Sequence, residues 1–320
     1  MSEADYRPKI KKQSQAKTLA EFDSAMDWLE KLPGVSSIGR FQTYRDNLSK
    51  VFRLILENRT DQILKQISPP EFIETHFEAN ALIEVWRQFQ TDNSARLAEK
   101  LRRVVGGQPY TSAEGKKTEP RDILFELELA ALLKEWSLPV DLGDPTDLIF
   151  EFQNTAILCE CKRVQNPNAL DGNLQEAGSQ LRKRLANQPQ SKVSLGMIGI
   201  NVSKIVHLDA SGTPRYPSTF YGKYLLPPNI VAVQNQHEFW SVVKQRLESF
   251  MAQHARALQR QFSTNVAGYL LFYRVPGMNI SGTGQMSVNT YPQIGPLRGA
   301  TPTEDQLLRD LHAHLLQYYL

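Results

Sequence analysis

Three side chains of types that hold metal ions and anions lie close together in one stretch of the chain. Asp147 stands at the start of one predicted strand, residues 147–152, while Glu160 and Lys162 stand in the next, residues 155–164. Alternate residues of a strand share a face, so Glu160 and Lys162 are expected to point the same way. Such a trio fits a cation site flanked by a fixed positive charge.

The pairing of these two strands decides whether the carboxylates meet. If residues 153–154 form a two-residue hairpin loop, Phe152 opposes Thr155, and Asp147 then directly opposes Glu160. Directly opposed side chains have Cβ atoms about 5 Å apart, and two like charges there are destabilising unless a cation neutralises them. The Gln-Asn loop is not of the favoured Asn-Gly type, and a bulge or an odd-length loop would shift this register.

The cation expected at such a site is magnesium. Carboxylate oxygens are hard ligands of the kind that Mg²⁺ prefers, and this ion often completes its shell with water and substrate phosphate. A bound Mg²⁺ can lower the pKa of water and polarise a phosphoryl oxygen. Lys162 could then orient that water or stabilise charge developing on the phosphate. The main-chain carbonyl of Cys161 is a further candidate ligand.

A helix expected before the hairpin, residues 120–136, could supply another carboxylate. It is apolar on nearly every side, and its glutamates Glu126 and Glu128 would need partners if buried. They lie about 200° apart around the helix, so only one can face the hairpin. We prefer Glu126, which shares a stripe with Ala130 and Leu133. Glu128, or a solvent position for both glutamates, remains open.

From about Arg121 to Leu185 the chain resembles the PD-(D/E)XK nuclease superfamily, which includes restriction endonucleases and Holliday-junction resolvases. The resemblance implies an α/β fold with a mixed sheet, on a restriction-endonuclease-like core of helix, three-stranded antiparallel meander, helix and strand. It implies that Asp147 is the motif aspartate and that Glu160 and Lys162 are the (D/E)XK pair. It also implies that Glu126 is the carboxylate that many members carry on the preceding helix.

The motif departs from the family pattern in one respect. Thr146 separates Pro145 from Asp147, and Asp144, which precedes that proline, is therefore the alternative aspartate. A second Glu-x-Lys triplet, residues 114–116, lies in a polar stretch with no strand around it, so the triplet alone is uninformative. The surrounding helices and strands therefore carry the resemblance.

The helix expected after the hairpin, residues 173–187, resembles the second helix of the family core. Members often carry a glutamine or a basic residue there, near the site, and Gln180 is our candidate, with Gln175 as the substitute. Basic residues near the site could contact a phosphate backbone; they are Arg163, Arg182, Lys183 and Arg184. The alternative is a solvated helix end that the helix dipole favours.

The resemblance implies a metal-dependent endonuclease, a phosphodiester hydrolase that uses Mg²⁺, with Mn²⁺ able to substitute. Its substrate would be nucleic acid, DNA rather than RNA. The alternative is a catalytically inactive protein that keeps the nuclease fold and binds nucleic acid or serves in assembly. A third hypothesis is a helical adaptor whose function resides in residues 18–105, through which a homodimer or a protein partner could also form.

Shifts in composition predict how the chain is organised. Residues 1–17 are predicted to be a basic flexible arm, and residues 18–105 an all-helical unit, because apolar residues recur there at spacings of three and four. Residues 106–119, rich in Gly, Ser, Thr and Lys, are the expected linker. Residues 120–320 are the expected nuclease-like domain. Further strands are predicted within 193–208, 266–275 and 285–291, and further helices over 236–262 and 303–319.

The overall composition is that of an ordinary globular chain. Its 320 residues include 37 Lys and Arg, 34 Asp and Glu, and 41% apolar residues, which excludes a wholly disordered or collagen-like chain. The net charge of +3 neither requires nor excludes a nucleic-acid partner. No apolar run is long enough to span a membrane and the start lacks a secretory signal. The 2 cysteines fit a reducing, cytoplasmic compartment.

Overall fold

The computed structural model describes residues 15–35, 38–59, 62–110, 119–143, 146–187, 194–221, 224–226, 228–258, 266–279 and 286–317. The chain divides into two compact units. The first, here the helical unit, holds the described residues of Lys12–Leu132 and Phe220–Pro227. The second, here the sheet unit, holds the described residues of Leu133–Thr219 and Pro228–Leu320.

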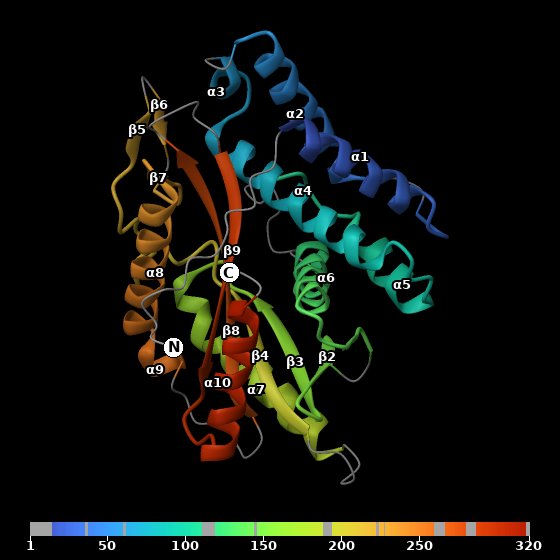
Figure 1. Cartoon of the computed structure of the whole chain (residues 1–320), viewed down its shortest axis with the longest axis vertical. Coiled ribbons are helices and arrows are strands. Elements are labelled where there is room, and N and C mark those ends of the chain that lie inside the picture. Colours follow the sequence, from blue (N-terminus) through green and yellow to red (C-terminus); the bar gives the residue numbers. More distant parts are fainter. Residues whose placement is uncertain are drawn as a thin grey trace. The chain divides into compact units, whose positions relative to one another are not determined.

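The described residues in the main segment of the helical unit are largely helical. The helices are α1 (Gln15–Glu30), α2 (Arg40–Leu56), α3 (Ile63–Gln66), α4 (Pro69–Phe89), α5 (Ala95–Val104) and α6 (Glu119–Glu135), drawn in Figure 1. Residues 15–17, which we assigned to the flexible arm, form the first turn of α1, and residues 1–14 lie outside the described residues. The chain passes from the helical unit to the sheet unit within α6, after Leu132.

A capping box explains where the longest helix of this unit begins. The Ser68 hydroxyl accepts a hydrogen bond from the main-chain N–H of Glu71, and the Glu71 carboxylate accepts one from the main-chain N–H of Ser68 at 3.1 Å. Proline occupies the first helical position, where its missing N–H is not needed. The sequence therefore starts α4 locally, before any tertiary contact is made.

Two buried arginines share one glutamate inside the helical unit. Arg40 of α2 and Arg121 of α6 are 1% and 2% exposed. Each donates from Nε to the Glu78 carboxylate at 3.1 Å, and Arg121 also pairs with Glu74 at 3.3 Å. Buried guanidinium groups require such compensation, because desolvating a charge is expensive.

The same two arginines donate hydrogen bonds to main-chain carbonyls in the segment that we predicted to be a linker, residues 106–119. Arg121 donates to the carbonyls of Gln108 and Pro109 at 3.0 and 2.8 Å, and Arg40 donates to the carbonyl of Gly106. The first part of the segment is therefore held against the helical unit, and residues 111–118 lie outside the described residues. Local composition favoured a free linker because these contacts come from residues distant in the sequence.

The sheet unit contains one mixed sheet. Its strands are β1 (Val140–Asp141), β2 (Leu148–Phe152), β3 (Thr155–Arg163), β4 (Ser194–Asn201), β7 (Val231–Val233), β8 (Val266–Asn279) and β9 (Met286–Pro296). The order across the sheet is β1-β2-β3-β4-β8. Strand β7 pairs with the C-terminal end of β8, on the same edge as β4, and β9 pairs with the opposite edge of β8. A separate pair is formed by β5 (Thr219–Tyr221) and β6 (Tyr224–Leu226), and nearly all of it belongs to the helical unit.

The strand directions change at β3. The first three strands form an antiparallel meander, whereas β4 runs parallel to β3 and β8 runs parallel to β4. Helix α7 (Leu170–Ala186) makes the crossover between β3 and β4. Strand β4 is buried at six successive positions, as expected for a parallel strand that is covered on both faces. The mixed α/β class that we predicted is therefore what the chain adopts.

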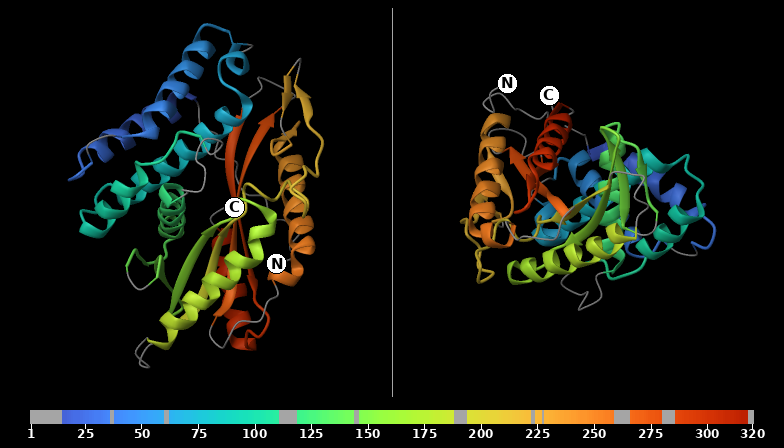
Figure 2. Two further views of the ribbon diagram at one scale, coloured as in Figure 1. Left: turned by 180° about the vertical axis from the view of Figure 1, so that it is seen from behind. Right: turned by 90° about the horizontal axis from the view of Figure 1, so that it is seen from below.

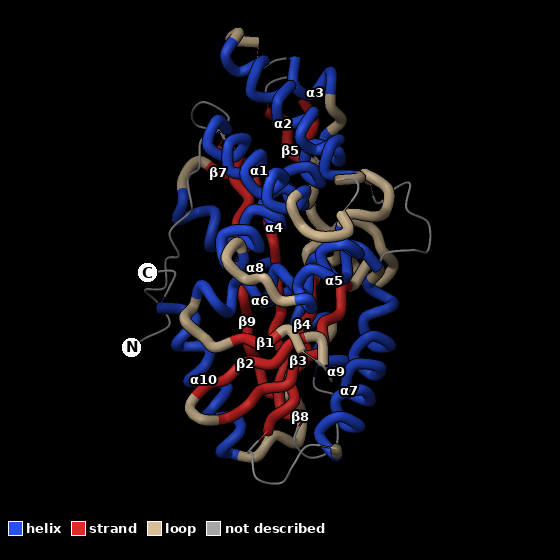
Figure 3. The backbone as a smooth tube through the Cα atoms, turned by 90° about the vertical axis from the view of Figure 1, so that its right-hand side faces the viewer, coloured by secondary structure: helices blue, strands red, loops and turns tan. Residues whose placement is uncertain are grey.

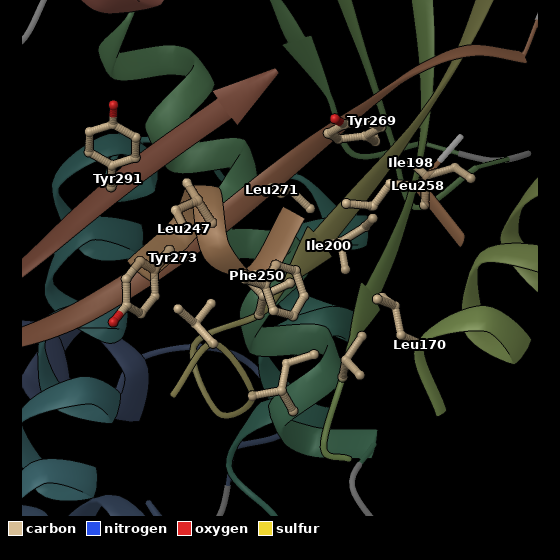
Figure 4. Packing of buried hydrophobic residues seen from close by; sticks show 14 of the residues in the cluster. Leu170, Ile198, Ile200, Leu247, Phe250, Leu258, Tyr269, Leu271, Tyr273 and Tyr291 are labelled. Atoms are coloured by element: carbon tan, nitrogen blue, oxygen red, sulfur yellow. The ribbon is translucent and has the colours of Figure 1, made fainter. Parts of the chain in front are cut away.

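Helices cover both faces of this sheet. Helices α7 and α8 (Gln236–Gln253) lie on one face, where they share a buried cluster with β3, β4 and β8 (Figures 2 and 4). Helix α10 (Pro302–Gln317) lies on the opposite face, so the strands stand between α7 and α10 in Figure 3. It approaches so closely that a Cβ at Gly268 would lie 2.8 Å from Leu308. Among the described residues, no helix is both long and apolar enough to cross a membrane.

The long helices and strands that we predicted are confirmed, whereas the structure also contains short strands that we did not predict. Strands β8 and β9 extend beyond their predicted ends, and the helix predicted over 236–262 is divided at His254 into α8 and α9 (Ala255–Leu258). Strands β1, β5, β6 and β7 have two or three residues each. Such strands are too short to show an alternating pattern, and their pairing partners alone define them.

Burial and a nearby arginine in the sheet unit together lower the pKa of a histidine. Arg246 of α8 donates to the carbonyl of Pro228 at 3.0 Å, and its guanidinium lies 4.3 Å from the centre of the Tyr216 ring. Burial, and then the positive charge of Arg246, lower the pKa of His207 to about 4. Both effects disfavour the imidazolium, so His207 is neutral in the folded protein at neutral pH.

Replacing Glu78 by Gln is expected to lower the free energy of unfolding by roughly 3–5 kcal/mol, because two buried guanidinium groups lose their shared carboxylate. Urea denaturation followed by circular dichroism measures this loss. Glu57→Gln is the matched control, since the partner of Glu57, Arg59, is 56% exposed, and its effect is expected to stay within about 0.5 kcal/mol. Equal effects for the two variants would contradict the buried network.

Stability is expected to fall as the pH falls from about 6.5 to about 4, with His207 as one cause. The unfolded chain binds a proton at this side chain in that range while the folded protein does not, which removes up to roughly 3 kcal/mol of stability. His207→Gln should flatten this part of the stability profile, measured by urea denaturation at stepped pH. His237→Gln, at an exposed position of α8, is the control, and a profile unchanged by His207→Gln would refute the assignment.

Candidate active site

The β2–β3 hairpin has the register that we predicted. Phe152 pairs with Thr155, and the ladder continues to Leu148 opposite Cys159. Gln153 and Asn154 form the loop with φ angles of 47° and 61°. Two successive positive φ angles are typical of the type I′ turn, whose twist matches that of the flanking strands. The turn therefore keeps the favoured geometry without the favoured Asn-Gly sequence.

Asp147 lies at the open end of this hairpin, directly before β2. Its Oδ2 accepts a hydrogen bond of 2.7 Å from the main-chain N–H of Cys161. That peptide joins Glu160 to Cys161, so the carboxylate of Asp147 lies against the backbone between the glutamate and Lys162. The contact has a simple cause, because β2 begins at Leu148 and offers no residue to pair with this part of β3.

Glu160 is the most deeply buried of the candidate residues. It is 1% exposed, in the middle of β3. Its carboxylate forms an ion pair with the guanidinium of Arg184, which lies in the last turn of α7. A buried carboxylate requires such a partner, since its desolvation is otherwise uncompensated.

Lys162 also finds its partner on α7. Its Nζ lies 2.9 Å from Oε1 of Glu176, and the side-chain amide of Gln180 donates to the same oxygen at 3.3 Å. Residues 176, 180 and 184 are each four apart and therefore form one stripe of the helix. This stripe faces the side of β3 that carries Glu160 and Lys162.

The charges of the site are largely compensated within the chain. Two ion pairs cross from β3 to α7, Glu160 with Arg184 and Lys162 with Glu176. Asp147 adds a negative charge that accepts a main-chain hydrogen bond. The five groups together carry three negative and two positive formal charges, which leaves a net charge of about one negative unit at neutral pH.

The donor atoms at this place suit a hard divalent cation. Asp147 and Glu160 provide carboxylate oxygens and Cys161 a main-chain carbonyl, and Mg²⁺ is commonly held by one or two carboxylates with waters and substrate phosphate. Within the described residues, no group of three or more His, Cys, Asp or Glu side chains gathers as a potential metal site. A metal here would therefore rely on two side chains, one main-chain oxygen and solvent.

The helix carboxylates belong to the helical unit. Glu126 forms an ion pair with Lys100 of α5, and both side chains are mostly buried. Glu128, the alternative, is 3% exposed. Glu126 thus has a cationic partner within its own unit, and its role toward Asp147 and Glu160 stays a prediction. The alternative aspartate, Asp144, lies outside the described residues.

The four basic candidates do not share one environment. Arg182 and Lys183 are exposed on α7, and Arg163 at the end of β3 is half-buried. Arg184 instead pairs with Glu160, a contact that sequence reasoning missed. Gln175 is exposed, whereas Gln180 stands beside Glu176 and Lys162. The spacing of four residues on either side of Gln180 was the signal that could have pointed to Glu176 and Arg184.

Comparison with known proteins adds no relative to this picture. No protein-family model matches the chain, and no curated protein matches it in sequence.

The turn offers a test of the hairpin geometry. Asn154→Gly should raise the stability of the protein by about 0.5–1 kcal/mol, because glycine adopts a positive φ without the strain that other residues incur. Asn154→Val should lower stability by about 1–2 kcal/mol, since a β-branched residue is unfavourable there. Thermal unfolding measures both, with Thr155→Val in the adjacent strand as the neutral control. A stabilising Asn154→Val would show that the loop has another conformation.

Proposed function

We propose that the protein is a Mg²⁺-dependent nuclease, an endonuclease that hydrolyses phosphodiester bonds in DNA in preference to RNA. The observation that carries this proposal is the hydrogen bond from the Cys161 amide to Asp147. It joins the aspartate to the strand segment that bears Glu160 and Lys162, which is the juxtaposition that the (D/E)XK resemblance requires.

The order of the elements supports the same proposal. Helix α6 is followed by the antiparallel strands β1, β2 and β3, then by α7, and then by β4 parallel to β3. This is the sequence of helix, meander, helix and strand that the resemblance implies for a restriction-endonuclease-like core. One fold can host many functions, so the residues at the site are what favour a nuclease.

Asp147, Glu160 and the Cys161 carbonyl would hold the Mg²⁺, and the role of Glu126 stays a prediction from the resemblance. When bound, the metal supplies positive charge to a phosphoryl oxygen and a water of lowered pKa. Lys162, held in place by Glu176, donates hydrogen bonds to the attacking water or to the phosphate oxygens as charge develops. Because Mn²⁺ accepts the same oxygen ligands, it should substitute for Mg²⁺.

Gln180 has an acceptor that is suited to a substrate or water contact. Its amide nitrogen donates to Glu176, while its buried Oε1 finds no hydrogen-bond partner among the described residues. A buried carbonyl oxygen without a partner is uncommon in folded proteins. In the proposed reaction this oxygen would accept a hydrogen bond from the attacking water and fix its orientation.

The exposed basic residues of α7 support a nucleic-acid substrate. Arg182 and Lys183 lie on the solvent side of the helix that carries Gln180, and Arg163 ends the strand that carries Lys162. Such residues would contact phosphates on either side of the scissile bond, so binding should weaken as salt is raised.

One observation favours the second candidate, an inactive protein that binds nucleic acid or serves in assembly. Glu160 and Lys162 both have partners on α7, and a cluster that is neutralised in this way can be purely structural. Binding of DNA without cleavage under any metal condition would select this candidate.

Nicking of supercoiled plasmid in Mg²⁺ tests the proposal. The wild-type protein should cut, EDTA should stop it, and Lys162→Met and Asp147→Asn should each reduce the rate at least about 100-fold, because each removes charge that acts on the transition state. Lys244→Met, at an exposed position of α8, is the matched control and should cut normally. If the wild-type protein cuts no DNA or RNA, the enzyme assignment fails, and if both variants cut normally, the site lies elsewhere.

A further inference from the structure

The ion pair between Glu160 and Arg184 places a positive charge where the proposed metal would bind. Glu160 is held in the centre of a sheet, 1% exposed. Arg184 reaches it from α7, and among the described residues no other cation pairs with this carboxylate. The buried negative charge is therefore already neutralised without a metal.

A divalent cation and a guanidinium cannot both lie against one buried carboxylate without repelling each other. This repulsion is strong in a poorly solvated site, where charges are weakly screened. Removing the arginine has the opposite effect, because it leaves Glu160 as an uncompensated buried charge that attracts any available cation. Either the arginine or a metal ion can therefore pair with the Glu160 carboxylate, but not both.

Arg184 is the partner that can move. It stands in the last turn of α7, and 28% of its side chain is exposed, against 2% for Glu160. A long flexible side chain at a helix end can turn toward solvent without displacing the backbone. Glu160, by contrast, is fixed by the pairing of β3 with β4.

We propose that Arg184 is the resident counter-ion of Glu160 and competes with the metal for it, so that Arg184 sets how tightly the site binds a divalent cation. The inference rests on the proposed function, since it assigns Glu160 as a metal ligand. It makes Arg184 a residue that regulates metal binding, in place of the phosphate contact that its basic character first suggested.

Titration of the full chain with Mn²⁺, followed by electron paramagnetic resonance without nucleic acid, measures the effect directly. Arg184→Met should bind Mn²⁺ roughly tenfold more tightly than the wild type, within the range typical of coupled binding equilibria. Arg184→Lys, which keeps the charge, should resemble the wild type, and Glu160→Gln should lose the site. Arg182→Met removes an exposed charge from the same helix and should change the affinity less than about twofold.

The melting temperature with and without Mn²⁺ is a second measurement, which also shows whether each variant is folded. Mn²⁺ should raise the melting temperature of Arg184→Met more than that of the wild type, because the metal replaces the missing counter-ion. Arg184→Gln, which keeps a hydrogen-bond donor without the charge, should show the same larger rise.

The outcomes separate the two proposals. If Arg184→Met and Arg184→Gln bind Mn²⁺ no more tightly than the wild type while Glu160→Gln abolishes binding, the metal site stands and the competition is refuted. If neither the wild type nor the Arg184 variants bind Mn²⁺ at millimolar concentration, the metal-dependent function itself fails.

Discussion

The register of the β2–β3 hairpin is the constraint on which the candidate site depends. A shift of one residue would turn Glu160 and Lys162 to the opposite face of the sheet, because side chains alternate along a strand. The left-handed conformation of Gln153 and Asn154 closes the loop in two residues and prevents such a shift. The open end of the hairpin then brings Asp147 to the Cys161 amide.

Both units compensate buried charges by pairing glutamate with arginine. In the helical unit, Arg40 and Arg121 share Glu78 and hold the carbonyls of the following loop. In the sheet unit, Arg184 neutralises Glu160. The two arrangements differ in consequence. The first is enclosed and serves stability, whereas Arg184 is partly exposed and, under the proposal, would exchange with a metal.

Under the proposal, the metal would have to displace Arg184 before cleavage could occur. Two ion pairs join β3 to α7, and they occupy Glu160 and Lys162, the carboxylate and the lysine of the proposed reaction. Release of Arg184 would free Glu160, while Glu176 would continue to orient Lys162. Under the proposed function, cleavage would require a metal concentration high enough to displace Arg184, and this would set a threshold for activity.

Local patterns in the sequence determined β2, β3, α7 and the pairing of the hairpin, because alternation, helical periodicity and a two-residue loop all act over a few residues. They also predicted that Asp147, Glu160 and Lys162 lie close together, whereas Gln180 was a candidate only through the resemblance. Only the tertiary structure decided the partners Glu176 and Arg184, since these depend on which stripe of α7 packs on β3. It likewise decided the short strands, whose existence depends on distant partners, and the fixed course of residues 106–110, whose carbonyls are bound by arginines far away in the chain.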